Sequence, residues 1–206
     1  MAYGHPPEQL YLFCFLVLFT HGILFRFTRK IEKVLSALTL VLGGAASGKS
    51  VTAEKIILNS GLHPVYLATS RVFDEEMEAK IKVHKARRNA RWINVDAAND
   101  TAQALKSCVQ GHAVLLDCAT MWLTNALLDG DDLSDAQSNL LNALSDCAAP
   151  VVVVTNEVGQ GIVPDNALAR QFREAQGRLN IALAAQADCV IHVVAGLSQT
   201  LKGVHP

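Results

Sequence analysis

Residues 43–50 have the types and spacing of a phosphate-binding loop. The run Gly43-Gly44-Ala45-Ala46-Ser47-Gly48-Lys49-Ser50 fits the pattern G-x-x-x-x-G-K-[ST] without a mismatch. Glycines let backbone N–H groups approach a triphosphate closely, while Lys49 is expected to reach its β- and γ-phosphates and Ser50 to place a hydroxyl on Mg²⁺. The alternative is a turn of small residues that binds nothing. We favour a nucleotide site, because a strand-like run precedes the motif and a helix-compatible segment follows it.

A carboxylate, Asp117, ends a later apolar run at residues 113–116. In enzymes with a phosphate loop, an acidic residue at the end of such a strand holds Mg²⁺ through water. An aspartate at this place can equally be an ordinary cap of the following helix. The sequence leaves both interpretations open.

A histidine, His84, stands among Lys85, Arg87 and Arg88. Neighbouring cations oppose formation of the imidazolium ion and so favour a neutral, nucleophilic ring, and they can also receive phosphate oxygens. Such a histidine is suited to covalent attack on phosphorus. The surrounding segment, 74–88, changes from acidic to basic along its length, and a plain solvated helix also explains that order.

Two glycines and several polar residues follow the apolar run at residues 151–154. This segment, Thr155-Asn156-Glu157-Val158-Gly159-Gln160-Gly161-Ile162-Val163-Pro164, is typical of a functional loop at the end of a strand. A tight connection without a ligand is the alternative, and Pro164 fits the start of a helix. We expect Arg170 and Arg173, farther along, to face solvent rather than phosphate.

Continuous apolar runs alternate with segments of helical periodicity. The runs lie at residues 38–42, 65–68, 113–116, 151–154 and 189–194, and the helical segments at 51–59, 74–88, 101–109, 121–128, 134–147 and 166–187. Strands that are apolar throughout are buried on both faces, as in a parallel sheet covered by helices. The sequence therefore predicts a doubly wound α/β domain with a mostly parallel sheet of the P-loop NTPase type, whose site lies at the carboxyl ends of the strands.

The composition limits the class of protein. Half of the 206 residues are hydrophobic, 18% are charged and the net charge is −1, which argues against disorder and against nucleic acid as a partner. The five cysteines are scattered without a C-x-x-C pair. We therefore expect reduced, mostly buried cysteines in a cytoplasmic protein, with neither a disulfide framework nor zinc.

Residues 1–35 form an apolar extension ahead of the predicted nucleotide-binding domain, 36–206. The apolar run 10–25 is shorter than the roughly 20 residues that span a bilayer comfortably, and it lacks the features of a secretory signal. One interpretation is that the extension arises from a misassigned start, the genuine one being Val34 or Leu35. A second is a membrane anchor, whose basic flank would keep the domain in the cytoplasm, and a third is some other role.

With these motifs placed, the sequence resembles the bifunctional adenosylcobinamide kinase / adenosylcobinamide-phosphate guanylyltransferase family of cobalamin biosynthesis. The resemblance covers residues 38–202 and rests on five blocks. These are the phosphate loop, Tyr66-Leu67-Ala68-Thr69-Ser70, His84-Lys85 with Trp92 shortly after, Asp117-Cys118 followed by Trp122-Leu123-Thr124-Asn125, and Val153 to Pro164.

The resemblance implies two reactions and a set of site residues. The family phosphorylates adenosylcobinamide, then carries GMP from GTP on a histidine to adenosylcobinamide phosphate, with ATP or GTP as phosphoryl donor; its members form homo-oligomers. By resemblance His84 is the guanylylated residue, and Lys49 acts with it in catalysis. The implied nucleotide contacts are the phosphate loop, Ala68, Thr69, Ser70, Lys85, Ala86, Arg87, Arg88, Asp96 and Asp117, with Ser50 and Asp117 toward Mg²⁺.

Two other classes of function compete with this one. A simple phosphate-loop kinase of a small hydroxyl compound would need Lys49, Ser50 and Asp117 but would have no use for His84. A nucleotide-dependent switch or membrane-tethered partner would need binding alone and would make residues 10–25 essential. The segment 155–164 and the helical histidine favour the bifunctional enzyme.

Overall fold

Seven strands form one sheet at the centre of the structure, a computed structural model that describes residues 35–71, 88 and 90–206. The strands are β1 (Leu38–Gly43), β2 (His63–Ala68), β3 (Ile93–Asp96), β4 (His112–Asp117), β5 (Val151–Asn156), β6 (Cys189–Val194) and β7 (Leu197–Lys202). Their order across the sheet is β3-β2-β4-β5-β1-β6-β7. All neighbours pair in parallel except β6 and β7. The α/β fold with a mostly parallel sheet is thereby confirmed.

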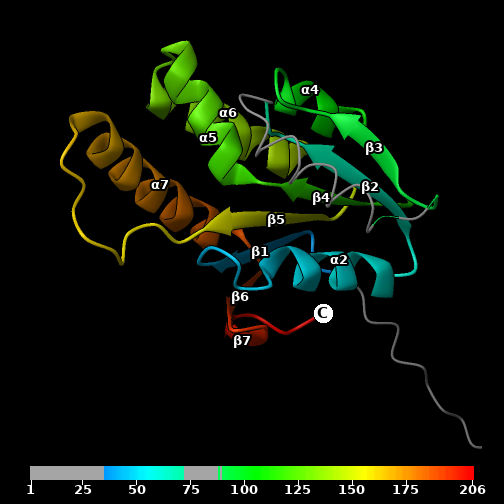
Figure 1. The fold of residues 1–206 in the computed structure, drawn as a ribbon. Coiled ribbons are helices and arrows are strands. Elements are labelled where there is room, and N and C mark those ends of the chain that lie inside the picture. Colours follow the sequence, from blue (N-terminus) through cyan, green and yellow to red (C-terminus); the bar gives the residue numbers. More distant parts are fainter. Residues whose placement is uncertain (1–34, 72–87, 89) are drawn as a thin grey trace, which may run out of the picture. The chain divides into compact units, whose positions relative to one another are not determined.

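Helices cover both faces of this sheet (Figure 1). They are α2 (Lys49–Asn59), α4 (Thr101–Lys106), α5 (Ala119–Asp129), α6 (Leu133–Asp146) and α7 (Ala167–Gln186). Helix α2 packs on β1, β4, β5 and β6 from one face, whereas α5 and α7 contact β5 and β1 from the other. The described residues all belong to one compact unit.

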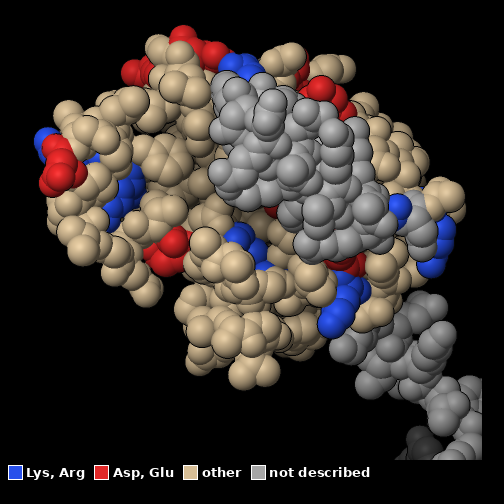
Figure 2. Space-filling view, viewed as in Figure 1, with Lys and Arg blue, Asp and Glu red and all other residues tan. Residues whose placement is uncertain are grey.

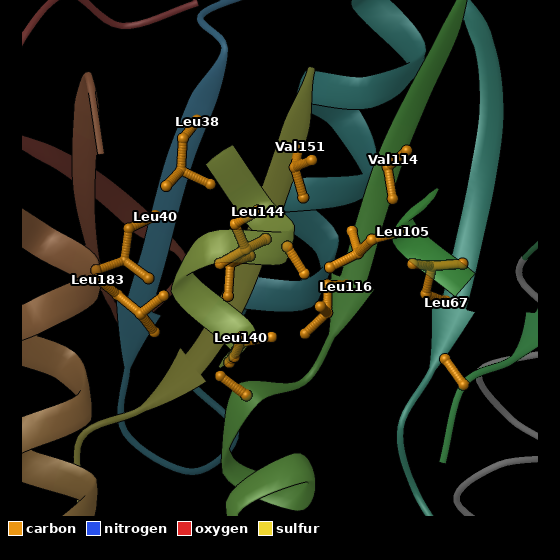
Figure 3. Close-up of a cluster of buried hydrophobic side chains, with 14 of the residues drawn as sticks. Leu38, Leu40, Leu67, Leu105, Val114, Leu116, Leu140, Leu144, Val151 and Leu183 are labelled. Atoms are coloured by element: carbon orange, nitrogen blue, oxygen red, sulfur yellow. The ribbon is translucent and has the colours of Figure 1, made fainter. Parts of the chain in front are cut away.

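The larger apolar cluster lies between the sheet and helices α4 to α7. Figure 3 shows Leu40 and Leu116 of the strands and Leu140 and Leu183 of the helices, with side chains directed into the space between the layers. A second cluster joins the opposite face of the sheet to Ile56 and Ile57 of α2. Because each strand is buried on both faces, its sequence is apolar throughout rather than alternating.

The sequence missed two strands, both at edges of the sheet. Strand β3 has four residues, none of them buried, and every residue of β7 is exposed. Such strands carry no continuous apolar run, which is the signal that revealed the other five. The glycine of Ala195-Gly196 was a weak sequence signal for the turn before β7. In the structure both residues have positive φ angles (52° and 78°), as hairpins joined by two residues prefer.

Helix boundaries differ from the predicted ones mainly at the caps. Helix α7 begins at Ala167 with Asn166 as its N-cap, so Pro164 does not start it. Helix α4 ends at Lys106, three residues before the predicted end at Val109. The run 10–25 and almost all of the predicted helix 74–88 lie outside the described residues. Within the described ranges no helix has the length and apolar character to cross a membrane.

Charged side chains are dispersed over the surface. On the face shown in Figure 2, acidic and basic side chains of the described residues lie singly or in small groups among uncharged ones. This distribution agrees with the near-zero net charge of the whole chain. The described surface of this face therefore carries no extended field of one sign.

Two cysteines lie together beneath α4. The thiols of Cys108 and Cys147 donate to consecutive carbonyl oxygens of that helix, those of Ala104 (3.4 Å) and Leu105 (3.5 Å). When the Cys108 S–H turns from the Ala104 carbonyl to Cys147, it lowers the pKa of Cys147 below its ordinary value, whereas the same bond and burial raise the pKa of Cys108. The half-buried Cys147 therefore carries more thiolate at neutral pH than an ordinary cysteine.

We expect Cys147 to be the fastest of the four described cysteines to react with iodoacetamide at pH 7, because thiolate is the reactive form. Mass spectrometry of the alkylated peptides measures the order. Cys108→Ala removes the hydrogen-bond donor and should slow the reaction of Cys147 at that pH. Faster alkylation of Cys108 than of Cys147 would contradict the assignment.

Core packing predicts a large difference between two leucines of α7. Leu183 is fully buried, so Leu183→Ala should lower the free energy of unfolding by about 2–5 kcal/mol through lost burial and a cavity. Leu168→Ala, on the same helix at 54% exposure, should change it by no more than about 0.5 kcal/mol. Urea denaturation of both variants measures the two values, and equal losses would contradict this packing.

Candidate nucleotide-binding site

The phosphate loop connects β1 to α2 at the carboxyl edge of the sheet, and close backbone packing shapes it. A Cβ atom on Gly43 would lie 2.5 Å from the carbonyl oxygen of Val193. Gly48 has φ of +95°, which favours glycine, and a Cβ there would lie 3.2 Å from Cα of Gly196. The N–H of Gly196 donates to the carbonyl of Ser47 at 2.8 Å. The β6–β7 turn thus supports the loop from behind.

The start of α2 offers backbone donors to an anion. No side chain caps this end of the helix, and its first turn contains no acidic residue. The first N–H groups of a helix have no partner within the helix, and the helix dipole makes this end positive. A phosphate group would satisfy both, as it does at other helix N-termini.

The amine of Lys49 lies over the loop. Its Nζ donates to the carbonyl oxygen of Gly44 at 3.0 Å. Burial lowers the pKa of Lys49 below its ordinary value, and Cys118 and Asp117 act in the opposite direction. Lys49 opens α2 and Asp117 ends β4, and both lie at the carboxyl edge of the sheet. A lysine beside a carboxylate suits binding of a phosphate next to a cation.

Asp117 ends β4 and does not cap the helix that follows. The N-cap of α5 is Cys118, without a side-chain hydrogen bond, so the capping interpretation of Asp117 is wrong. Its Oδ2 instead accepts a hydrogen bond from the Tyr66 hydroxyl at 3.2 Å. Tyr66 lies on the neighbouring strand β2. The carboxylate is therefore oriented by a side chain from another strand.

The residues after β2 lie beside Asp117. Ala68 pairs with Asp117 in the register of the two strands. The Thr69 hydroxyl donates to the Cys118 carbonyl and accepts from the Cys118 N–H, both at 2.8 Å, while Asn125 Nδ2 donates to the Thr69 carbonyl at 2.8 Å. Thr69 is fully buried and locks the two strand ends together. A contact of Ala68, Thr69 or Ser70 with a nucleotide stays a prediction.

Arg88 and Asp96 lie at the β2–β3 side of the site. The guanidinium of Arg88 lies 3.4 Å from the centre of the Tyr66 ring, and its Nε donates to Asn94 at 2.9 Å. Asp96 pairs with Ala68 in register, and its carboxylate accepts from the Ala98 N–H. A cavity of about 480 Å³ adjoins it, lined by Val95, Asp96, Asn99, Asp100, Gln103, Ala104 and Ser107. His84, Lys85, Ala86 and Arg87 lie outside the described residues.

The segment after β5 starts beside the phosphate loop. The N–H of Glu157 donates to the carbonyl of Gly43 at 3.1 Å, and that of Asn156 to Thr120 Oγ1 at 2.8 Å. Arg173 donates to the carbonyl of Gly159. This side chain therefore holds the loop and does not simply face solvent as expected.

Arg170 is exposed, as expected, but its guanidinium also bonds to the backbone. Its Nη1 donates to the carbonyl oxygens of Pro164 (3.0 Å) and Asp165 (2.6 Å). Sequence reasoning missed these contacts because they join an exposed side chain to backbone, which leaves no trace in residue patterns. The segment 155–164 is consequently tied to α7 at two places.

A buried polar cluster under this segment was also missed. Gln176 Nε2 donates to Thr155 Oγ1 at 3.0 Å and to Asn180 Oδ1 at 2.9 Å, while Asn180 Nδ2 donates to the carbonyl of Asn156 at 3.0 Å. Gln176 and Asn180 are one helical turn apart and buried on α7. Two amides at i and i+4 on the apolar face of a helix were the available signal.

The donor set determines what this site can bind. Among the described residues no group of three or more His, Cys, Asp or Glu side chains could hold a metal ion. Mg²⁺ commonly takes one or two protein ligands and completes its shell with phosphate oxygens and water. One carboxylate, Asp117, and one hydroxyl, Ser50, fit that pattern, but only together with a bound nucleotide.

A phosphate loop between the first strand and its helix, with a lysine and a carboxylate from a nearby strand, defines a P-loop nucleotide-binding protein. Its fold is similar to that of an ATPase from the type III secretion system of pathogenic bacteria, with a TM-score of 0.51, 12% identity, and coverage of 82% of this chain and 59% of that one. The cobinamide kinase / cobinamide phosphate guanyltransferase family model matches residues 39–201. The chain belongs to this family.

Two relatives agree with the family model over most of the chain. A bifunctional adenosylcobalamin biosynthesis protein of Pseudomonas aeruginosa is 40% identical over 167 residues, which are 80% of this chain and 96% of that protein. Its counterpart in Escherichia coli is 41% identical over 179 residues, or 79% of this chain and 98% of that protein. These matches confirm the resemblance found in the sequence.

Two adjacent glycines of the loop should respond differently to the same substitution. Gly43→Ala places a Cβ against backbone and should lower the melting temperature by several degrees, because the loop or β6 must shift. Gly44→Ala meets nothing within 4 Å and should leave the melting temperature nearly unchanged. Thermal unfolding of both variants without nucleotide measures this difference, and equal effects would contradict the packing described above.

Proposed function

We propose that this chain phosphorylates adenosylcobinamide and then transfers GMP from GTP, through a guanylylated histidine, to adenosylcobinamide phosphate, giving adenosylcobinamide-GDP. Membership of the family is the observation that carries this proposal. The arrangement of Lys49, Asp117 and the start of α2 supports it, because both reactions need a triphosphate held at one place. GTP serves the second reaction, and ATP or GTP serves as phosphoryl donor in the first.

In the kinase reaction the loop binds and orients the triphosphate. Backbone N–H groups at the start of α2 contact its phosphate oxygens, and Lys49 moves from the Gly44 carbonyl to the β- and γ-phosphates. Ser50 and Asp117 would hold Mg²⁺, which when bound neutralises charge on the phosphates. In this reaction the protein mainly positions the reactants and stabilises the charge of the transition state, as in other phosphoryl transfers.

In the second reaction His84 is the proposed nucleophile. A neutral ring nitrogen forms a bond to the α-phosphorus of GTP while the bond from that phosphorus to the bridging oxygen breaks, and pyrophosphate leaves. A phosphate oxygen of adenosylcobinamide phosphate then attacks the same phosphorus and releases the histidine. Two displacements thereby replace one difficult transfer between two anions. Lys85 to Arg88 are proposed to contact the phosphates, and Asp96 the nucleotide.

The same proposal includes the division of the chain into two parts and its association into a homo-oligomer. The family match begins at residue 39, which supports residues 36–206 as the catalytic domain and residues 1–35 as dispensable for chemistry. A homo-oligomer in the cytoplasm is proposed from the family resemblance. Comparing the activity of the full chain with that of a chain beginning at Val34 tests the first point.

His84→Ala should abolish covalent labelling of the protein by GTP that carries its label on the α-phosphate. The full chain is incubated with this GTP and Mg²⁺, denatured, and treated with acid or alkali. Label on a histidine should be lost in acid and retained in alkali, since a phosphorus–nitrogen bond is acid-labile. Label on the γ-phosphate should not be retained, because pyrophosphate leaves.

His63→Ala is the matched control, because this exposed histidine lies at the opposite end of the strands. It should label like the unchanged protein, and the label should pass to adenosylcobinamide phosphate. Equal labelling of the His84→Ala variant would reject His84 as nucleophile. Absence of label on protein that binds GTP and phosphorylates adenosylcobinamide would support a simple phosphate-loop kinase instead.

A further inference from the structure

Tyr66 is a buried tyrosine whose hydroxyl points at the edge of the site. It is 6% exposed and lies on β2, two residues before the strand ends. Tyr66 pairs with Leu115 of β4, so Asp117 stands two residues farther along the neighbouring strand. Residues two apart on a strand share a face, and diagonal neighbours of this kind are within reach of an aromatic side chain. The hydrogen bond of 3.2 Å to Asp117 follows from that register.

Two other side chains fix the Tyr66 ring. The Trp92 ring meets it edge to face, with centroids 6.4 Å apart and an angle of 80° between planes. The Arg88 guanidinium lies over it at 3.4 Å from the centroid and is itself bonded to Asn94. Both contacts are favourable geometries for aromatic rings. The Tyr66 hydroxyl is thus held in one direction by Trp92 and Arg88.

We propose that Tyr66 is a positioning residue: its hydroxyl holds the Asp117 carboxylate in one orientation at the carboxyl edge of the sheet, where the phosphate loop also lies. Asp117 is the residue assigned to Mg²⁺, so this inference rests on the proposed function. Ordering a carboxylate on binding an ion costs conformational entropy. The hydrogen bond from Tyr66 lowers that cost in advance, and Arg88 and Trp92 hold Tyr66.

A tyrosine that merely fills the core would be replaced by phenylalanine without consequence for Mg²⁺. Tyr66→Phe deletes the hydroxyl alone and keeps the ring on which Arg88 and Trp92 pack. The informative measurement is equilibrium binding of fluorescent GTP to the full chain at increasing Mg²⁺ concentration. It needs no turnover and separates ion-dependent from ion-independent binding.

We expect Tyr66→Phe to raise the Mg²⁺ concentration for half-maximal binding by about tenfold, since a hydrogen bond to a charged group is lost. Binding in the presence of EDTA should be unchanged. Ser60→Ala is the matched control, because it removes a hydroxyl bonded to the Ile57 carbonyl at the far end of α2. It should leave both measurements as they are. No shift in Tyr66→Phe, or an equal loss with and without Mg²⁺, would overturn the proposal.

The Asp117→Asn background tests that Tyr66 acts through Asp117. In it, Tyr66→Phe should cause no further shift in the Mg²⁺ dependence, because the group being positioned has lost its charge. A full additional shift would overturn the proposal. The histidine-labelling experiment is independent of these measurements. Absence of label together with a tenfold Mg²⁺ shift would reject the bifunctional chemistry while leaving the role of Tyr66 intact.

Discussion

The contact between the phosphate loop and the β6–β7 turn is the constraint on which the rest of the site depends. A Cβ on Gly43 would collide with the Val193 carbonyl, and one on Gly48 would contact Gly196 tightly in a positive-φ conformation that favours glycine. This contact directs the loop back toward α2, and the first N–H groups of that helix are then available to bind an anion. The exposed edge strand β7 thus has a structural role beyond pairing with β6, because the turn that leads into it supports the loop.

The order of the strands brings together residues that are distant in the sequence. Because β5 lies between β4 and β1, the polar ends of these strands meet at one edge, with Asp117 on one side and the phosphate loop on the other. Glu157 follows β5 and bonds directly to Gly43. Ligands of open α/β sheets bind at this carboxyl edge, where loops can be polar without disturbing the core. The site is therefore a consequence of the topology, with only side-chain orientation left to local contacts.

How much of this the sequence could predict depends on the range of the interactions. The phosphate loop and the five buried strands were predictable, because a motif and an apolar run are local patterns. Asp117 was found, but its partner Tyr66 was not assigned a role, since their contact depends on the register of two strands 51 residues apart. Strands β3 and β7 could not be predicted because they are exposed and carry no apolar run. The bond from Arg173 to a backbone carbonyl could not be predicted because residue types do not reveal such a contact.

The polar cluster on α7 shows how the fold controls the segment after β5. Thr155, Gln176 and Asn180 lie in an apolar interior, where each unpaired polar group would cost about 1–3 kcal/mol. Leucine at position 176 would fill similar space, yet it would take a donor away from both Thr155 and Asn180. The bond from Asn180 to the Asn156 carbonyl then fixes where β5 ends. The buried polar side chains therefore contribute less apolar packing than leucine would, but their hydrogen bonds define where the loop beside Gly43 begins.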